Sequence, residues 1–368
     1  MELDVTRTIL YGICIPVIVL LCILAAVLNL AVFASRFYVK SRTTSLELTY
    51  SLSLSDTWTS TVIALSLFWN SYKTVILGMQ HSSFCFSLTM EIFRTGGLLT
   101  GVFHLAALAF IHYLQIVRPF DHARLLSLRQ CHAIIVLIWT LPPFALMIFF
   151  ASWEGQGYRI INCVPLYVYD SIWFRSQIAF IIFSLMLTTC IVYWRLLRVV
   201  DKVRMKTGAP SPATPALQSN GRGRAASRRT VITATLIFGT FIFGWAPACI
   251  LYVLTATGMP LNNDKSLWVN VLSVVVLLNI MIKTLTNPII YATRIPEIRN
   301  FVLNRMLYKI TGKTSAESER EATSIAARRR SEFTQQRSKT LNINTMLTTD
   351  SSSFIDKLER SSINRVDV

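Results

Sequence analysis

Four charged side chains interrupt long apolar stretches of this chain: Asp56, Glu91, Arg94 and Lys283. A charge inside an apolar helix is costly, so each of the four needs a partner or a function. Glu91 and Arg94 lie three residues apart, a spacing that places both on one helix face and lets them pair with each other. These four positions are the first candidates for chemistry in the sequence.

The sequence contains no pattern typical of catalysis or of metal binding. The chain has seven cysteines, but they form no CxxC or Cys/His ligand cluster, and no Ser/His/Asp set is evident. His104 lies within an apolar stretch, where we expect it to be a hydrogen-bonded structural histidine rather than a ligand. The sequence therefore predicts a protein that is not an enzyme and that carries no cofactor.

Composition indicates an integral membrane protein. The 368 residues are 53% hydrophobic and only 15% charged, with a mean hydropathy of +0.49, whereas soluble domains carry about 25% charged residues. A membrane-spanning helix needs roughly 20 apolar residues. The predicted fold is an all-α bundle of seven membrane-spanning helices, at residues 9–35, 46–73, 84–114, 131–152, 172–198, 229–257 and 267–292.

The basic residues predict the orientation of this bundle. The net charge is +17, and anionic lipid headgroups explain it better than nucleic acid, because the excess lies between the apolar stretches and in the tail. The positive-inside rule then places the short N-terminus, 1–8, outside the cell and the tail, 308–368, in the cytoplasm. Residues 208–224 and the tail are expected to be disordered, and residues 295–307 to form a short amphipathic helix on the membrane surface.

Motifs along the helices identify a family. The stretch TLTNPIIYATRIPEIRNF contains Asn287, Pro288 and Tyr291, and FIFGWAP contains Phe241, Trp245 and Pro247. With Asn29, Asp56, Trp139 and Tyr193 at matching places, residues 9–307 resemble a rhodopsin-like (class A) G-protein-coupled receptor. The resemblance implies a plasma-membrane receptor that transmits an extracellular signal to heterotrimeric G proteins. Further implied partners are membrane lipids and, through the Ser/Thr-rich tail, arrestin and receptor kinases.

The chain departs from the family where the G protein binds. The family's acidic residue and arginine at the end of the third span are replaced by Ile111 and His112, followed by Tyr113, and Ser227 and Arg228 stand where a partner acid is usual. Phe120 matches the apolar residue that packs into the G protein. Two alternatives follow: coupling is retained, or the chain is a poorly coupled, constitutive, decoy or scaffold receptor.

The resemblance also suggests where a ligand binds. Arg94 occupies the position at which amine receptors have an aspartate, which argues against a biogenic amine and leaves a small molecule, a lipid or a short peptide. Arg94 could bind a ligand carboxylate or phosphate, or it could simply pair with Glu91. The candidate ligand-binding residues are Glu91, Arg94, Leu98, Trp245 and Tyr252.

Two further pairings are implied by the family. Its members usually have a disulfide between the positions of Cys85 and Cys163. They also hold a sodium ion beside the aspartate matching Asp56, but Gly101 and Lys283 replace two of the ion's usual ligands. We therefore expect Lys283 to form an ion pair with Asp56 in a mid-membrane polar site that includes Asn29 and Asn287.

A retinal-binding photoprotein is the remaining alternative. Animal opsins carry their retinal lysine seven residues before the proline of the Asn-Pro motif, a position occupied here by Met281. Lys283 lies about 200° further around the helix, so the sequence disfavours this alternative.

Overall fold

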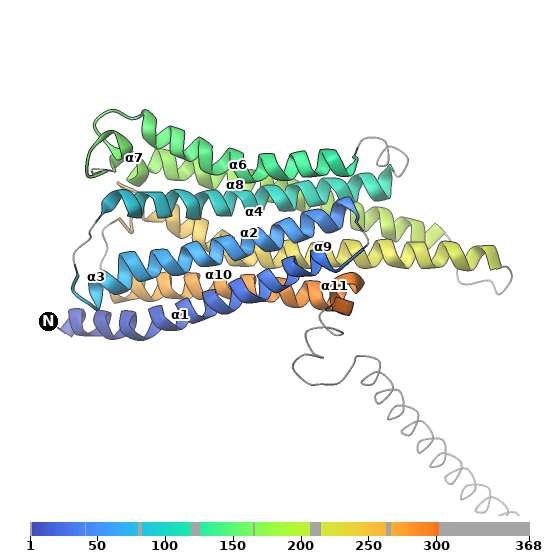
Figure 1. Cartoon of the computed structure of the whole chain (residues 1–368), viewed down its shortest axis with the longest axis horizontal. Helices are drawn as coiled ribbons and strands as arrows, with labels where there is room; N and C mark the ends of the chain where they lie inside the picture. The colour runs from blue at the N-terminus through green and yellow to red at the C-terminus, as the bar shows by residue number, and fades with distance from the viewer. Residues whose placement is uncertain are drawn as a thin grey trace, which may run out of the picture. The chain divides into compact units, whose positions relative to one another are not determined.

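The computed structural model describes residues 2–40, 42–79, 83–118, 126–164, 166–206, 215–262 and 266–301, and of residues 2–10, 200–230 and 234 only the backbone. Long helices run side by side along one axis of this part of the chain (Figure 1). They are α1 (Glu2–Ala34), α2 (Thr44–Leu67), α4 (Phe84–Val117), α6 (Leu128–Ser152), α8 (Ile172–Lys206), α9 (Pro215–Leu254) and α10 (Leu267–Arg294).

Short elements join the long helices. A π-helical turn, Phe68–Tyr72, extends α2 into α3 (Lys73–Val75), and α7 (Tyr167–Asp170) precedes α8. The 3-10 turns Ser35–Phe37 and Gly157–Arg159 follow α1 and α6, and α11 (Pro296–Phe301) follows α10. The proposed surface helix 295–307 is described only as far as Phe301, and the tail 308–368 lies outside the described residues.

Six of the long helices are apolar enough to cross a membrane, and α2 is the exception. Close to half of the residues in α2 are serine or threonine, yet most of them are buried. Most helix bounds lie close to those predicted, but α2 ends at Leu67 and passes into a π-helical turn, and α8 continues to Lys206 rather than ending at residue 198. Helix α1 begins at Glu2 rather than residue 9, and α9 begins at Pro215, so residues 215–224 are helical where the sequence predicted disorder.

Local sequence explains where several helices begin. The hydroxyl of Thr43 accepts a hydrogen bond from the backbone N–H of Leu46, and Ser83 does the same for Phe86. Ser127 and Gln130 form a reciprocal capping box at the start of α6. These side chains satisfy backbone donors that have no partner within the helix.

Small residues let α4 pack closely against two neighbours. A Cβ atom on Gly96 would lie 3.2 Å from Pro143 of α6, and one on Gly97 would lie 2.8 Å from Oγ1 of Thr59 in α2. Close backbone approach at glycine is how membrane helices gain packing contacts. Helix α4 therefore lies between α2, α6 and α8, while α10 packs against α1 and α9.

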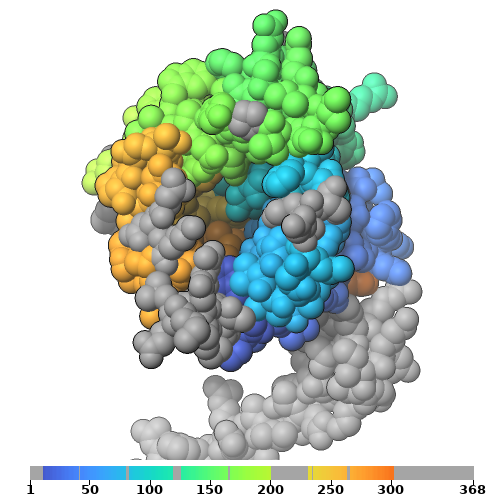
Figure 2. All heavy atoms as spheres, turned by 90° about the vertical axis from the view of Figure 1, so that its left-hand side faces the viewer, coloured from blue at the N-terminus to red at the C-terminus, as the bar shows by residue number. Residues whose placement is uncertain are grey.

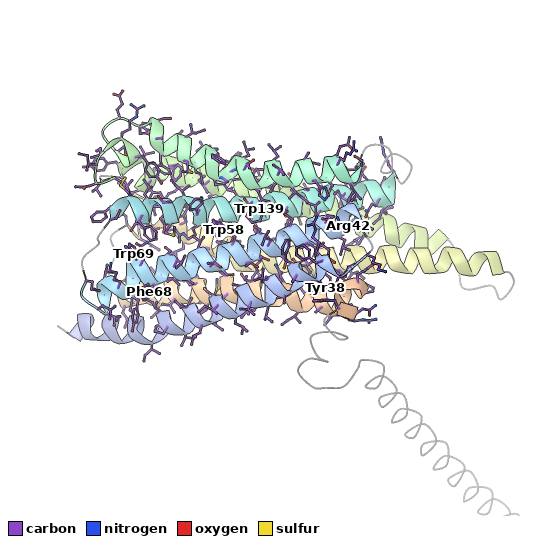
Figure 3. All side chains as sticks on the ribbon, viewed as in Figure 1. Tyr38, Arg42, Trp58, Phe68, Trp69 and Trp139 are labelled. Atoms are coloured by element: carbon purple, nitrogen blue, oxygen red, sulfur yellow. A yellow bond between two sulfur atoms is a disulfide. The ribbon has the colours of Figure 1, made fainter. Side chains whose placement is uncertain are left out.

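Large aromatic residues lie near both ends of the bundle. Phe68 and Trp69 lie at the end nearest the N-terminus, and Tyr38 lies toward the opposite end, while Trp58 and Trp139 lie between them (Figure 3). Tyr38 stacks on Phe301 of α11 with ring centroids 5.0 Å apart. Aromatic side chains at two levels are typical of the two membrane–water interfaces.

Candidate functional site

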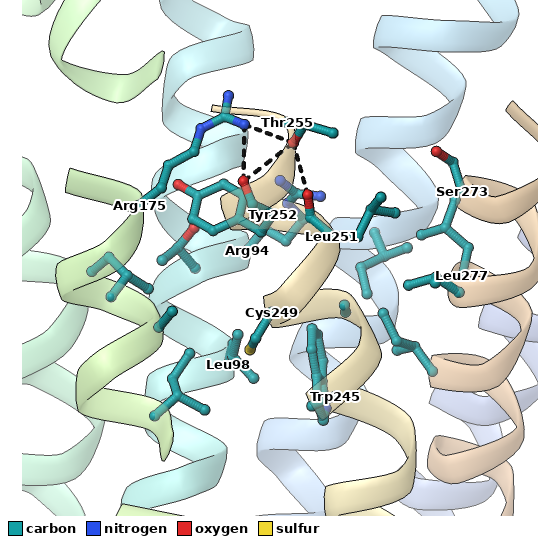
Figure 4. Close-up of a pocket in the computed structure, with 18 of the residues that line it drawn as sticks. Arg94, Leu98, Arg175, Trp245, Cys249, Leu251, Tyr252, Thr255, Ser273 and Leu277 are labelled. Carbon is teal, nitrogen blue, oxygen red and sulfur yellow. Dashed lines mark hydrogen bonds between the residues drawn. The ribbon is translucent and has the colours of Figure 1, made fainter. Parts of the chain in front are cut away.

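A cavity of about 360 Å³ lies at the end of the bundle nearest the N-terminus. Side chains of α4, α8, α9 and α10 line most of it (Figure 4). The surface at this end is hollowed between the cyan, green and orange segments (Figure 2). The deeper lining is apolar and includes Leu98, Ile178, Ile182, Val276, Leu277 and Ile280. A cavity of this size and character is suited to a small molecule.

Trp245 lines the inner end of this cavity. It is buried, as is Phe241 one turn below, and the two ring centroids are 6.4 Å apart. Pro247 lies within α9 just beyond them and removes a backbone donor from the helix. A molecule in the cavity would thus rest against the proline-bearing segment of α9.

Arg94 and Glu91 pair at the outer part of the cavity. Nη2 of Arg94 donates to Oε2 of Glu91, and the hydroxyl of Tyr169 donates to the same oxygen at 2.7 Å. Burial, and then the negative charge of Glu91, raise the pKa of Tyr169 well above its ordinary value of 10.0, which keeps this hydroxyl a donor. The pairing weighed for Glu91 and Arg94 is therefore present.

Arg175 connects three elements above the cavity. Its Nη2 lies 2.6 Å from Oδ1 of Asp170, its Nε donates to the carbonyl oxygen of Tyr169, and its Nη1 donates to Thr255 and to the carbonyl oxygen of Tyr252. The guanidinium carbon also lies 4.8 Å from the ring centroid of Tyr252. Arg175 therefore ties α7 to α8 and to the outer end of α9.

Of the five ligand-binding residues predicted, Arg94, Leu98, Trp245 and Tyr252 line the cavity. Glu91 does not, because its carboxylate is turned to Arg94 and Tyr169. Sequence reasoning missed Tyr169, Arg175 and Thr255. In the sequence, Arg175 is only one of the few basic residues on the side predicted to be extracellular, and nothing local to α7 indicates that it lies over the cavity.

The disulfide expected from the resemblance is present. It joins Cys85, in the first turn of α4, to Cys163, which lies between α6 and α7. This bond holds the segment that carries Tyr169 against the start of α4. The outer wall of the cavity is thus covalently attached to the bundle.

The predicted ion pair lies in the middle of the bundle. Nζ of Lys283 is 2.6 Å from Oδ1 of Asp56, and Nδ2 of Asn287 donates to Oδ2 of Asp56, also at 2.6 Å. Both charged side chains are buried, with exposures of 2% and 8%. Nζ of Lys283 also lies 5.1 Å from the ring centroid of Phe241. Asn29 joins this region by donating to the carbonyl oxygen of Thr284 at 3.1 Å.

Gly244 provides the space for the stem of Lys283. A Cβ atom on Gly244 would lie 2.6 Å from Cβ and 2.9 Å from Cγ of Lys283. A larger residue there would have to displace the stem of Lys283 or the backbone that carries it. Sequence reasoning noted the FGWAP stretch but not that its glycine faces the lysine.

His104 is a fully satisfied structural histidine, as expected. Its Nδ1 contacts the carbonyl oxygen of Thr100 at 2.8 Å, so that nitrogen must carry a proton. Nε2 can then accept from Ser51, whose oxygen accepts in turn from the indole N–H of Trp139. The chain of bonds fixes α2, α4 and α6 together.

His112 lies at the opposite end of the bundle, beside a second cavity of about 380 Å³. Its Nε2 is 2.9 Å from the hydroxyl of Ser45, and its Nδ1 is buried with no hydrogen-bond partner among the described residues. Ile111 packs in an apolar cluster with Leu108 and Leu114, and Tyr113 packs against that cluster. Phe120 lies outside the described residues.

Further residues of the family motifs lie inside the bundle. Tyr193 and Tyr291 are buried, and their hydroxyls make no hydrogen bond within the described part of the chain. Tyr193 lies 6.3 Å from the ring of His112, and Pro288 lies within α10 next to Asn287.

The arrangement agrees with a comparison against known families. The model of the family described as 7 transmembrane receptor (rhodopsin family) matches residues 15–291, which is well over half of the 368 residues and extends from α1 to α10. Membership implies a multi-pass membrane protein with a receptor's signalling role, and G proteins are the general partners of such receptors. This chain belongs to the rhodopsin family of seven-transmembrane receptors.

Proposed function

We propose that this receptor crosses the plasma membrane seven times, binds a small extracellular ligand in the cavity above Trp245 and activates a heterotrimeric G protein at the His112 end. The observation that carries the proposal is the cavity itself, which rests on the proline-bearing segment of α9. A ligand there can favour one packing of α9 over another.

Helix α2 is the span that brings the six apolar helices to the seven of this proposal. It is less apolar than the other long helices, but its polar side chains are largely buried against its neighbours. Asp56 has its ion-pair partner on α10. In the proposed topology the N-terminus lies outside, which places the disulfide in an oxidising compartment, and α11 begins the surface helix. Lipids, arrestin and receptor kinases are further proposed partners.

A poorly coupled or constitutive receptor is the second candidate. Its support is the buried His112, which bonds to Ser45 of α2 where relatives have an arginine. A histidine carries less charge at neutral pH than arginine and offers fewer donors to a G protein. The candidate differs from the first in the size of the G-protein response, not in the fold.

A ligand-independent activation assay across the G-protein families, in cells expressing the full chain, tests the proposal. We expect activation of at least one family above that of cells without the receptor. A receptor that reaches the cell surface but activates none would support the decoy alternative. Epitope tags at the two termini, detected with antibodies in intact and in permeabilised cells, test the topology.

A further inference from the structure

The cavity above Trp245 combines an apolar interior with cationic groups at its outer part. Among the described lining residues, the charged ones are Arg94 and Arg175, and both are positive. Their acidic partners, Glu91 and Asp170, do not line the cavity. A ligand head group entering the cavity therefore meets positive charge and hydrogen-bond donors rather than carboxylates.

Some N–H groups of Arg94 make no hydrogen bond to the described residues. Its contacts within the described residues all involve Nη2, which bonds to Glu91 and lies 3.4 Å from the hydroxyl of Tyr169. A guanidinium carries five N–H groups, so those on Nε and Nη1 are available to a ligand. The planar arrangement of these donors matches a carboxylate or phosphate.

Tyr252 adds a second unsatisfied group. Its hydroxyl is buried and makes no hydrogen bond to the described residues, and its side chain lines the cavity beside Arg175 (Figure 4). A buried polar group without a partner is costly. An acidic head group that accepts from this hydroxyl would remove the cost.

Glu91 can release Arg94 without losing all of its partners. Its Oε2 accepts from Tyr169 at 2.7 Å, and its Oε1 lies 3.4 Å from the hydroxyl of Ser66. The carboxylate would stay hydrogen-bonded if Arg94 turned toward a ligand. Asp170, the partner of Arg175, is itself 55% exposed, so water screens its charge.

The geometry points to an anionic amphiphile as the ligand class: a compact apolar body that fills the space around Leu98 and Ile280, with one carboxylate or phosphate bound by Arg94 and Tyr252. A cavity of about 360 Å³ is near the lower limit for small-molecule sites, which favours a small amphiphile over a peptide. This inference rests on the proposed function, because it takes the cavity to be the receptor's ligand site.

The test uses the full-length receptor in uncharged phosphatidylcholine nanodiscs and three probes of equal chain length: decanoate, decanol and decylamine. A ligand that binds the folded state raises the melting temperature as its concentration rises. We expect decanoate to stabilise the receptor, decanol to require a concentration at least tenfold higher, and decylamine to have no effect. Equal stabilisation by decanol or decylamine, or none by decanoate, would overturn the inference.

Substitutions locate the binding. Arg94→Gln should remove the preference for decanoate over decanol, while Arg159→Gln, on an exposed loop arginine, should leave it unchanged. Tyr252→Phe removes a hydroxyl that bonds to no described residue, so the fold should persist while decanoate binding weakens about tenfold, or 1.4 kcal/mol. Leu98→Trp should block both decanoate and decanol. A preference that survives both Arg94→Gln and Tyr252→Phe would overturn the assignment.

The same design separates this inference from the proposed function. G-protein activation without added ligand is measured in cells and does not depend on decanoate. If coupling is found and decanoate fails, the ligand class is wrong. If decanoate binds as expected and no G protein responds, the coupling proposal is wrong.

Discussion

Lys283 is held by groups from three helices. Asp56 of α2 neutralises its charge, the ring of Phe241 on α9 lies beside its ammonium group, and Asn287 of α10 bonds to the other oxygen of the same aspartate. A buried ion pair is stable only when its remaining hydrogen-bonding capacity is met. The three helices are therefore linked through a single side chain.

Removing the lysine should leave a buried, unpaired aspartate. We expect Lys283→Ala to lower the stability of the folded receptor by roughly 3–5 kcal/mol, measured as a lower melting temperature in nanodiscs. The matched control is Asp56→Asn combined with Lys283→Met, which removes both charges and should be less destabilising than Lys283→Ala alone. A double variant that is as unstable as the sum of its singles would show that the pair does not act as a unit.

We expect His112 to limit G-protein coupling, because a histidine carries less positive charge at neutral pH than the arginine usual in the family. We expect His112→Arg to alter basal or ligand-gated G-protein activation by about 5- to 150-fold, the fold-change that corresponds to typical allosteric coupling energies. Nucleotide exchange on membranes measures this, with His132→Arg, a partly exposed histidine at the same end, as the control. Ile111→Asp is not combined with His112→Arg, because Ile111 is buried in an apolar cluster that a carboxylate would disrupt. Identical signalling by His112→Arg and the unchanged receptor would mean that this position is not limiting.

At the level of helices, Gly244 of α9 leaves the space that the stem of Lys283 on α10 occupies. Gly244→Ala should destabilise the receptor by about 1–3 kcal/mol, because the new methyl group overlaps Cβ of Lys283. Gly239→Ala is the matched control on the same helix, since a Cβ there meets nothing within 4 Å. Thermal melting of the two variants compares them directly, and equal melting temperatures would contradict the packing argument.

The disulfide joins the start of α4 to the segment leading into α7. Cys85→Ser and Cys163→Ser should each reduce stability by about 2–5 kcal/mol and lower the amount of receptor at the cell surface. The double variant should be no worse than either single variant, because both changes remove the same bond. Cys190→Ser, at an exposed free cysteine, is the control. Full surface expression of Cys85→Ser would contradict the expected role.

Sequence reasoning located most of these helices because apolar runs and prolines are local signals. It placed Arg94 and Trp245 in the cavity and paired Asp56 with Lys283, since the family's spacing relates those positions. It could not find Arg175 or Tyr169, whose roles arise only when α7 folds over the ends of α8 and α9. Nor could it find Gly244, whose importance depends on which face of α9 meets α10.

For the molecule as a whole, Lys283 places a fixed cation beside Asp56, where the resemblance to the receptor family implies a sodium ion. We expect basal activity and ligand affinity to be unaffected when sodium is replaced by a large organic cation at constant ionic strength. Lys283→Asn restores one of the usual ligands beside Asp56, so this variant should become sensitive to sodium. Clear sodium dependence of the unchanged receptor would contradict the idea that Lys283 takes the ion's place.

Helix α2 has a consequence for how the receptor is made. Its serines, threonines and Asp56 are acceptable in the finished bundle because neighbouring helices cover them, but a newly made α2 meets the membrane before α10 has been synthesised. Asp56 must then enter lipid without its lysine, with α1 as the neighbouring helix that can shelter it. We expect α2 to be the slowest segment to integrate during biosynthesis, and chains stopped before residue 283 to be retained and degraded by the cell's quality control.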